Sequence, residues 1–179
     1  MRHLVKIACI IVFAASTSAF GASELFMMPK EQKAALSSLL SSLKAAKSSI
    51  DIAIYSFTNR EIAKALRDVA AKGVKVRVIY DESSNEPSNA SSTIGYLAKL
   101  QNVEVCTLKG NKAANGKFFG IMHMKVAIVD DSVLFIGSAN WSKNAFENNY
   151  ETLLRTTESA LVDKSRATFA EMRAKCREY

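Results

Sequence analysis

The sequence has few of the residues that commonly build metal centres. Its 179 residues include only two histidines and three cysteines. Neither histidine has a second histidine or clustered carboxylates at the spacing that a catalytic zinc or magnesium site requires. We therefore expect no metal and no other cofactor, and an activity that survives EDTA.

Long hydrophobic runs are also scarce, because the only one lies at the N-terminus. Residues 7–15 are small or apolar, Arg2 and Lys6 precede them, and small residues follow up to residue 22. This order is typical of a secretory signal peptide, and the run is short for a permanent membrane span. We expect residues 1–22 to be a signal peptide, with an uncleaved anchor as the alternative. The mature protein would be periplasmic or secreted. Association with a membrane surface is the alternative.

The composition of the whole chain fits a single folded domain, which we expect at residues 23–179. An apolar fraction of 49% with 8% aromatic residues is enough for one core, and no internal repeat is present. Without Arg2 and Lys6, the 24 basic residues fall to 22 against 17 acidic ones, a net charge of +5. Such a surplus favours polyanionic partners, namely nucleic acid or anionic lipid headgroups, although a basic surface also serves solubility alone.

Two cysteines remain once the predicted signal peptide, which contains Cys9, is set aside. An even pair in an exported protein predicts a disulfide between Cys106 and Cys176. Two separately buried thiols are the alternative.

Hydrophobic periodicity divides the domain into alternating strands and helices. Strands are predicted at 24–28, 50–57, 74–80, 103–108, 122–129, 133–137 and 150–156, and helices after 29, after a cap at 58 or 59, at 93–100 and at 158–176. The second helix joins two parallel strands, whereas the turn at 130–132 predicts an antiparallel hairpin. Residues 81–92 and 109–120 are expected to be exposed loops. The fold class is α/β, a mixed β-sheet flanked by helices on both faces.

Four polar residues interrupt the apolar segment 122–140. They are His123, Lys125, Ser138 and Asn140. Side chains two apart on a strand share a face, so each pair is expected to project together into one pocket. An imidazole can attack phosphorus, while an ammonium, an amide and a hydroxyl can donate to the non-bridging oxygens. The segment therefore predicts a pocket for phosphoryl transfer without a metal.

Two neighbours of these residues have structural roles in this prediction. Asp130 has the opposite parity from Lys125, so we expect it to point away and brace the hairpin. Gly137 either ends a strand or lets the backbone approach a phosphate closely.

The spacing His-x-Lys-x4-Asp-x6-Gly-Ser-x-Asn, which begins at His123, resembles the signature of the phospholipase D superfamily at every defined position. Residues 53–58, 73–76 and 139–143 are similar to those of its small bacterial endonucleases. The resemblance implies a covalent phosphohistidine on His123, with Lys125 and Asn140 binding phosphate. It also implies an acid that orients the histidine, for which Glu151 is the better match and Glu147 the poorer one.

The number of histidines adds a constraint. Displacement through a phosphohistidine needs a nucleophile on one side of phosphorus and a proton donor on the other. His3 lies in the predicted signal peptide, so the mature chain offers only His123. Larger members of the superfamily carry two copies of the motif. The simplest solution is a homodimer whose two-fold axis brings two His123 side chains together. Glu151 would orient the histidine of its own chain or of its neighbour.

Three functions fit these features. The first is an exported endonuclease without sequence preference, acting on DNA, single-stranded DNA included, or on RNA. The second is a phospholipase D or cardiolipin hydrolase, an activity known in the wider superfamily. The third is a nucleic-acid-binding protein without catalysis, against which the intact motif argues.

Further residues are candidates for substrate contacts. Lys109, Lys117 and Lys143 are placed to follow phosphates, and Phe118, or its neighbour Phe119, to stack on a base. A solvated loop is the alternative for the segment 109–119. Ser56 could line the pocket, but we favour a role in a turn. Trp141 could stack on a base, but we favour packing in the core.

Overall fold

The computed structural model describes residues 21–85 and 90–179. Residues 1–20 of the predicted signal peptide lie outside the described residues. Within the described part of the chain, no helix is long and apolar enough to cross a membrane.

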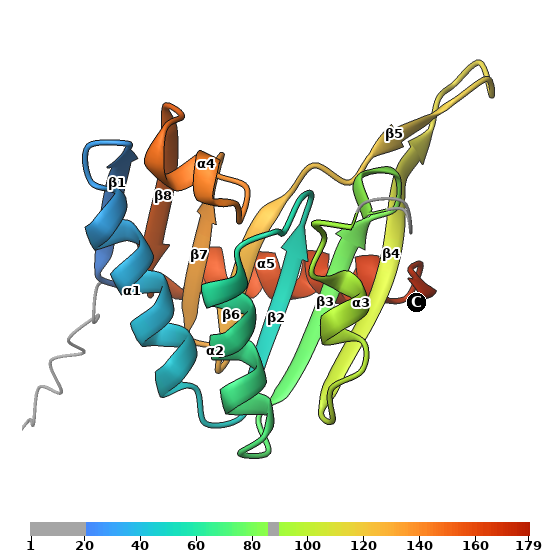
Figure 1. The fold of residues 1–179 in the computed structure, drawn as a ribbon. Coiled ribbons are helices and arrows are strands. Elements are labelled where there is room, and N and C mark those ends of the chain that lie inside the picture. The colour runs from blue at the N-terminus through green and yellow to red at the C-terminus, as the bar shows by residue number, and fades with distance from the viewer. Residues whose placement is uncertain (1–20, 86–89) are drawn as a thin grey trace, which may run out of the picture.

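A nine-stranded mixed sheet forms the centre of the domain (Figure 1). Its order is β1-β8-β7-β6-β2-β3-β4-β5, and β9 pairs with β4. The strands are β1 (Ser23–Met28), β2 (Ser49–Ile54), β3 (Lys75–Asp81), β4 (Val103–Lys112), β5 (Phe119–Ile121), β6 (Lys125–Val129), β7 (Val133–Gly137), β8 (Glu151–Thr156) and β9 (Arg177–Glu178).

The sheet has a parallel half and an antiparallel half. Strands β2, β3 and β4 are parallel to one another, whereas β6, β7, β8 and β1 alternate in direction. The two halves meet where β2 pairs antiparallel with β6. The predicted strand–helix–strand unit and the predicted hairpin are both confirmed.

Helices cover both faces of the sheet, as predicted (Figure 1). One face carries α1 (Gln32–Ala45), α2 (Arg60–Ala70), α3 (Ile94–Leu97) and α4 (Lys143–Glu147), whose apolar side chains join the larger core. The other face carries α5 (Ser159–Arg173), which buries Val162 and Phe169 against a smaller core. The structure also joins Cys106 of β4 to Cys176, just after α5, in a disulfide.

Local sequence explains the position of α2, which matters for the site. Ile62, Leu66 and Val69 recur at helical spacing and are buried. The side chain of Asn59 accepts hydrogen bonds from the backbone N–H groups of Glu61 and Ile62, so the predicted cap is confirmed. The first turn of α2 is thereby fixed beside the end of β2.

The loop predicted at 109–120 is wrong. Strand β4 continues to Lys112 and pairs antiparallel with β5, so the segment is a β-hairpin that projects beyond the sheet (Figure 1). A β-carbon on Gly110 would lie 2.5 Å from the carbonyl carbon of Gly120, so the glycine permits the close pairing. The predicted strand at 122–129 also differs, because β6 begins only at Lys125. The helix predicted at 93–100 is shorter, since α3 ends at Leu97.

Candidate active site

His123 and Lys125 both contact the ring of Tyr55. His123 lies just before β6, and its ring centre is 4.6 Å from that of Tyr55 in an edge-on contact. The Nζ of Lys125 lies 5.2 Å from the Tyr55 ring centre and donates to the backbone carbonyl of His123 at 2.8 Å. His123 is exposed, whereas Lys125 is only 5% exposed. An accessible imidazole thus stands beside a largely buried ammonium.

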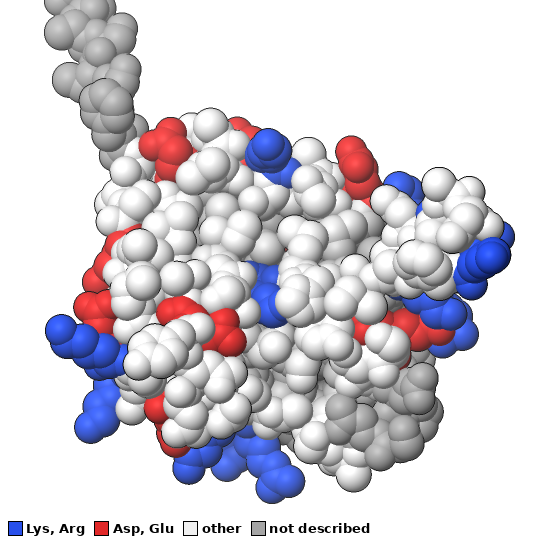
Figure 2. All heavy atoms as spheres, turned by 90° about the horizontal axis from the view of Figure 1, so that it is seen from above, with Lys and Arg blue, Asp and Glu red and all other residues white. Residues whose placement is uncertain are grey.

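The charge of Lys125 is only partly balanced. Burial lowers the pKa of its ammonium below the ordinary value, and the nearby negative charge of Glu151 opposes this shift. The site therefore holds a desolvated cation that gains from a bound anion. Figure 2 shows this end of the sheet from above, with a basic side chain in the middle of a mainly uncharged surface and acidic side chains beside it.

Ser138 and Glu151 are brought together at the ends of β7 and β8. The Ser138 hydroxyl donates to the Glu151 carboxylate and accepts the backbone N–H of Thr152 at 3.0 Å. The side-chain amide of Asn149 donates to the other Glu151 oxygen at 3.4 Å. Among the described residues, the Glu151 carboxylate is thus held by Ser138 and Asn149, not by His123 of the same chain.

Asn140 lies in the turn between β7 and α4. Its side-chain oxygen is buried and has no hydrogen-bond partner within the described residues. Buried polar atoms are normally paired, so this oxygen is available to accept a hydrogen bond from a ligand. The next residue fixes this turn, because the carbonyl of Trp141 accepts the N–H groups of Thr58 and Asn59.

Trp141 itself has the packing role that the sequence predicts. It is buried, with its ring centre 5.0 Å from that of Phe57 in an edge-on contact. Its backbone N–H donates to the carbonyl of Ser56. The turn that carries Asn140 is therefore anchored to the chain that leaves β2.

Two residues that hold the site were missed by the sequence analysis, which placed both in an exposed loop. Asp81, the last residue of β3, is 1% exposed, and its carboxylate accepts the backbone N–H of Met122 at 2.8 Å. The buried side chain of Asn85 donates to the carbonyl of Tyr55 at 2.9 Å and to that of Asp81 at 2.8 Å. Asn85 thus holds Tyr55, whose ring contacts His123, and Asp81 holds Met122, the residue before His123. The sequence did contain a signal for Asp81, because a carboxylate directly after an apolar strand is often placed for a specific contact.

Asp130 lies at the other end of β6 from His123. Its carboxylate accepts the backbone N–H groups of Lys47, Ser48 and Ser49. Burial alone would raise the pKa of Asp130, but these bonds outweigh it and lower the pKa. The carboxylate therefore ties the hairpin turn to the start of β2, rather than bracing the hairpin itself as predicted, and it is remote from the imidazole.

Gly137 is required by close packing. A β-carbon at this position would lie 2.1 Å from the carbonyl oxygen of Thr152 in β8. The glycine therefore permits the pairing of β7 with β8 that presents Ser138 to Glu151.

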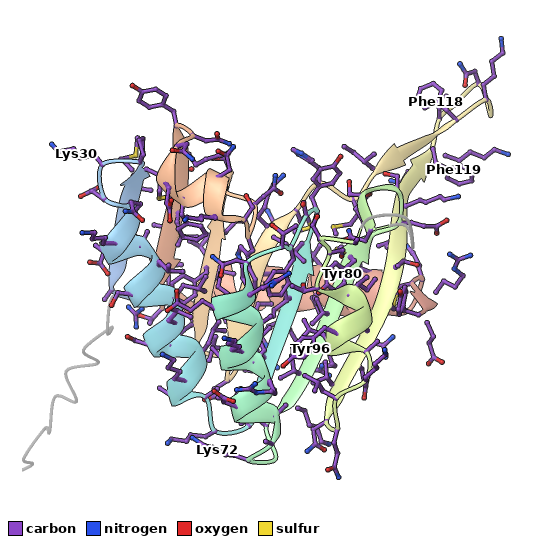
Figure 3. All side chains as sticks on the ribbon, in the orientation of Figure 1. Lys30, Lys72, Tyr80, Tyr96, Phe118 and Phe119 are labelled. Carbon is purple, nitrogen blue, oxygen red and sulfur yellow. A yellow bond between two sulfur atoms is a disulfide. The ribbon has the colours of Figure 1, made fainter. Side chains whose placement is uncertain are left out.

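The predicted substrate contacts lie on both sides of the site rather than inside it. Lys109 pairs with Glu82 at 3.1 Å, and its Nζ lies 5.5 Å from the Phe119 ring centre. Phe118 is 61% exposed on the projecting hairpin (Figure 3), where Lys117 is also exposed. Lys143, on α4, forms an exposed ion pair with Glu147 at 3.7 Å. In the described part of the chain, no three His, Cys, Asp or Glu side chains are grouped so that they could hold a metal ion.

The fold is that of phospholipase D family members. The chain superposes on NucT from Helicobacter pylori with a TM-score of 0.86 and 52% identity, covering 89% of this chain and 99% of NucT. It superposes on Nuc from Salmonella typhimurium, a phospholipase D family member, with a TM-score of 0.75 and 27% identity, covering 89% of this chain and 98% of Nuc.

Sequence comparison gives the family. The model for the "Cardiolipin synthase, PLD-like domain" family matches residues 39–173. Human mitochondrial cardiolipin hydrolase is 35% identical over 130 residues, which are 73% of this chain and 47% of that protein. The chain thus spans about half the length of this curated relative. The chain belongs to the phospholipase D-like family, which confirms the resemblance inferred from the motif.

Proposed function

We propose that this chain is an exported, metal-independent endonuclease that hydrolyses nucleic-acid phosphodiester bonds through a phosphohistidine on His123. The observation that carries the proposal is that an exposed imidazole and a buried ammonium both contact the ring of Tyr55. The buried side-chain oxygen of Asn140, which has no partner among the described residues, is a second sign of a polar ligand. Attack at phosphorus requires a nucleophile such as the imidazole. Stabilisation of the phosphate oxygens requires hydrogen-bond donors such as the ammonium and the side-chain amide.

The chemistry takes two steps. A ring nitrogen of His123 attacks phosphorus, the bond from phosphorus to the leaving oxygen breaks, and Lys125 and Asn140 donate to the non-bridging oxygens. The partner's His123 gives its proton to the leaving oxygen. Water then attacks the phosphohistidine, the partner's His123 takes up the proton, and the nitrogen–phosphorus bond breaks. The pair of copies ends as it began.

An exposed apolar row supports the homodimer. Leu25 of β1 pairs with Leu154 of β8, which pairs with Ile136 of β7, so the three side chains share one face. Leu25 is 56% exposed and Ile136 36% exposed. Since Phe26 points into the core under α1, this row lies on the face of α5. Ser138, two residues after Ile136, has the same parity, so a second copy packed on the row would lie beside the Ser138–Glu151 pair.

Charge substitutions in this row test the dimer. Leu25→Lys and Ile136→Lys should yield monomers with little activity, because each monomer holds only one copy of His123. Tyr179→Lys, at an exposed position of the C-terminus, is the matched control and should leave a dimer. Sedimentation velocity and activity are measured on the same samples. A fully active monomer would refute the shared pocket.

Lipid hydrolysis is the second candidate function. It is supported by the relative named mitochondrial cardiolipin hydrolase and by the exposed Phe118, Phe119 and Ile121 on the hairpin. The net positive charge and the likeness to small bacterial endonucleases favour nucleic acid, with Lys109, Lys117, Phe118 and Lys143 as substrate contacts on either side of the site.

One experiment separates the two. The protein is incubated in EDTA with single-stranded DNA, duplex DNA, RNA and cardiolipin vesicles, and His123→Ala is the matched inactive control. We expect cleavage of nucleic acid that the substitution abolishes. Hydrolysis of cardiolipin alone would overturn the nuclease assignment, and loss of activity in EDTA that magnesium restores would overturn metal independence.

A further inference from the structure

A basic hollow lies between α2 and α3, outside the site described above. Its volume is about 430 Å³, and none of the described residues that line it carries a carboxylate. Arg60, Lys64 and Arg67 line the side of α2, and Ser92 and Tyr96 line the opposite side. Other hollows of the surface, such as the one that includes Lys143, also contain carboxylates.

The three cations lie on one face of α2. Positions 60, 64 and 67 follow helical spacing, and the burial of Ile62 and Leu66 turns these positions outward. Among the described residues, neither Arg60 nor Lys64 forms an ion pair, whereas Arg67 bonds to Asp68 at 2.6 Å. Within the described part of the chain, the charges of Arg60 and Lys64 at the hollow are thus not balanced by an ion pair.

The hollow adjoins the active site. Arg60 directly follows Asn59, whose N–H donates to the carbonyl of Trp141, the residue after Asn140. On the other side, both the N–H and the hydroxyl of Thr93 donate to the carbonyl of Phe57. The segments that bound the hollow are thus those that anchor the catalytic turn.

A hydrogen-bond chain connects the hollow to the catalytic pair. Ser92 donates to the side-chain oxygen of Asn85 at 2.7 Å, and Asn85 donates to the carbonyl of Tyr55 at 2.9 Å. The ring of Tyr55 contacts both His123 and Lys125. A ligand that orders Ser92 therefore acts on the surface against which His123 rests.

We propose that this hollow binds a phosphodiester stretch of the nucleic-acid strand whose scissile bond lies at His123. The inference rests on the proposed function and adds a second contact region to it. The three cations extend for about 10 Å along the helix axis, which suits successive phosphates better than one headgroup. Tyr96 is 43% exposed on α3 (Figure 3) and offers a ring on which a base can stack.

Binding is measured with the His123→Ala protein, which leaves the strand intact. A fluorescent single-stranded oligonucleotide is titrated in EDTA at several salt concentrations. The doubly substituted Arg60→Glu/Lys64→Glu protein should bind about tenfold or more weakly, and its salt slope should fall by about 1.4, the value for two lost contacts on a single strand. Lys72→Glu/Lys75→Glu, with the same charge change at the opposite end of α2, is the control and should change affinity far less.

The outcomes are distinct. Equal losses in both double variants, or no loss in the hollow variant, would overturn the proposal. Stronger loss of binding to cardiolipin vesicles than to the oligonucleotide would assign the hollow to lipid and would also overturn it. With His123 intact, the hollow variant should lose more kcat/KM on a long strand than on bis(4-nitrophenyl) phosphate. Failure of the unsubstituted protein to hydrolyse either substrate would refute the proposed function instead.

Discussion

Two carboxylates at opposite ends of the sheet permit a controlled test of how His123 is positioned. Asp81 accepts the backbone N–H of Met122, next to His123, whereas Asp130 accepts three backbone N–H groups at the start of β2. Replacing either with alanine leaves donors without acceptors. Only Asp81 lies beside the imidazole, so the pair separates stability from catalysis.

The expected stability losses are similar. A buried donor without an acceptor costs about 1–3 kcal/mol, and the Met122 bond is fully buried, so Asp81→Ala should lose about 2–4 kcal/mol once the bond from the N–H of Ser84 is included. The bonds of Asp130 are partly exposed, and water replaces them in part, so Asp130→Ala should lose about 1–3 kcal/mol. Urea unfolding measures both losses, with the fluorescence of the buried Trp141 as the probe.

The expected catalytic losses differ. Asp81→Ala should reduce kcat on bis(4-nitrophenyl) phosphate by about 10- to 100-fold, because small displacements of reacting groups are costly. Asp130→Ala, assayed well below its unfolding temperature, should retain most of its activity. Losses of kcat that follow stability alone in both variants would refute the reasoning.

The pH dependence of stability gives Asp130 an independent readout. Its folded-state pKa is lowered from 3.8, so its contribution to stability is complete above the unfolded pKa. The contribution is lost as the pH falls through the lowered value. The stability difference between the unsubstituted protein and Asp130→Asn should therefore shrink below about pH 4. A difference that stays constant with pH would contradict this assignment.

Three further outcomes follow from the structure. Reduction of the Cys106–Cys176 disulfide, whose cysteines are 70 residues apart, should lower the free energy of unfolding by about 4 kcal/mol, measured by urea titration with and without reductant. Burial lowers the pKa of Lys125 and the charge of Glu151 partly offsets this, so Glu151→Gln should lower that pKa further. The loss of phosphodiester binding at alkaline pH should then begin at lower pH, and an unchanged pH profile would exclude the coupling. Gly137→Ala places a methyl group against β8 and should cost about 1–3 kcal/mol in thermal unfolding, and an unchanged melting temperature would contradict the close contact.

Periodicity predicted the sheet and the central part of the site because those segments have a buried face. Alternating and continuous apolar runs identified β2, β3, β6 and β7, and the pairing of His123 with Lys125 followed from a spacing of two. The geometric reason was only partly right, since His123 precedes β6. The two side chains meet because Tyr55 lies against both.

The hairpin of β4 and β5 was mispredicted for the opposite reason. Phe119–Ile121 are all exposed, so no core selects an apolar pattern there, and the glycines and lysines are typical of a loop. Asp81 and Asn85 were missed because their role depends on Met122 and Tyr55, about 30 to 40 residues away in sequence. Such partners follow from the topology, which local pattern does not give.

The junction between β2 and β6 has a consequence for how activity arises during folding. Tyr55 follows a strand of the parallel half, whereas His123, Lys125 and Asn140 belong to the antiparallel half. In the register, Ile52 lies opposite Ala127, so these halves join through contacts that are remote along the chain. Contacts between segments that are remote along the chain are slow to form, because closing long loops costs entropy. A chain in which only one half has formed holds no assembled site, so turnover reports the completed sheet rather than either part of it.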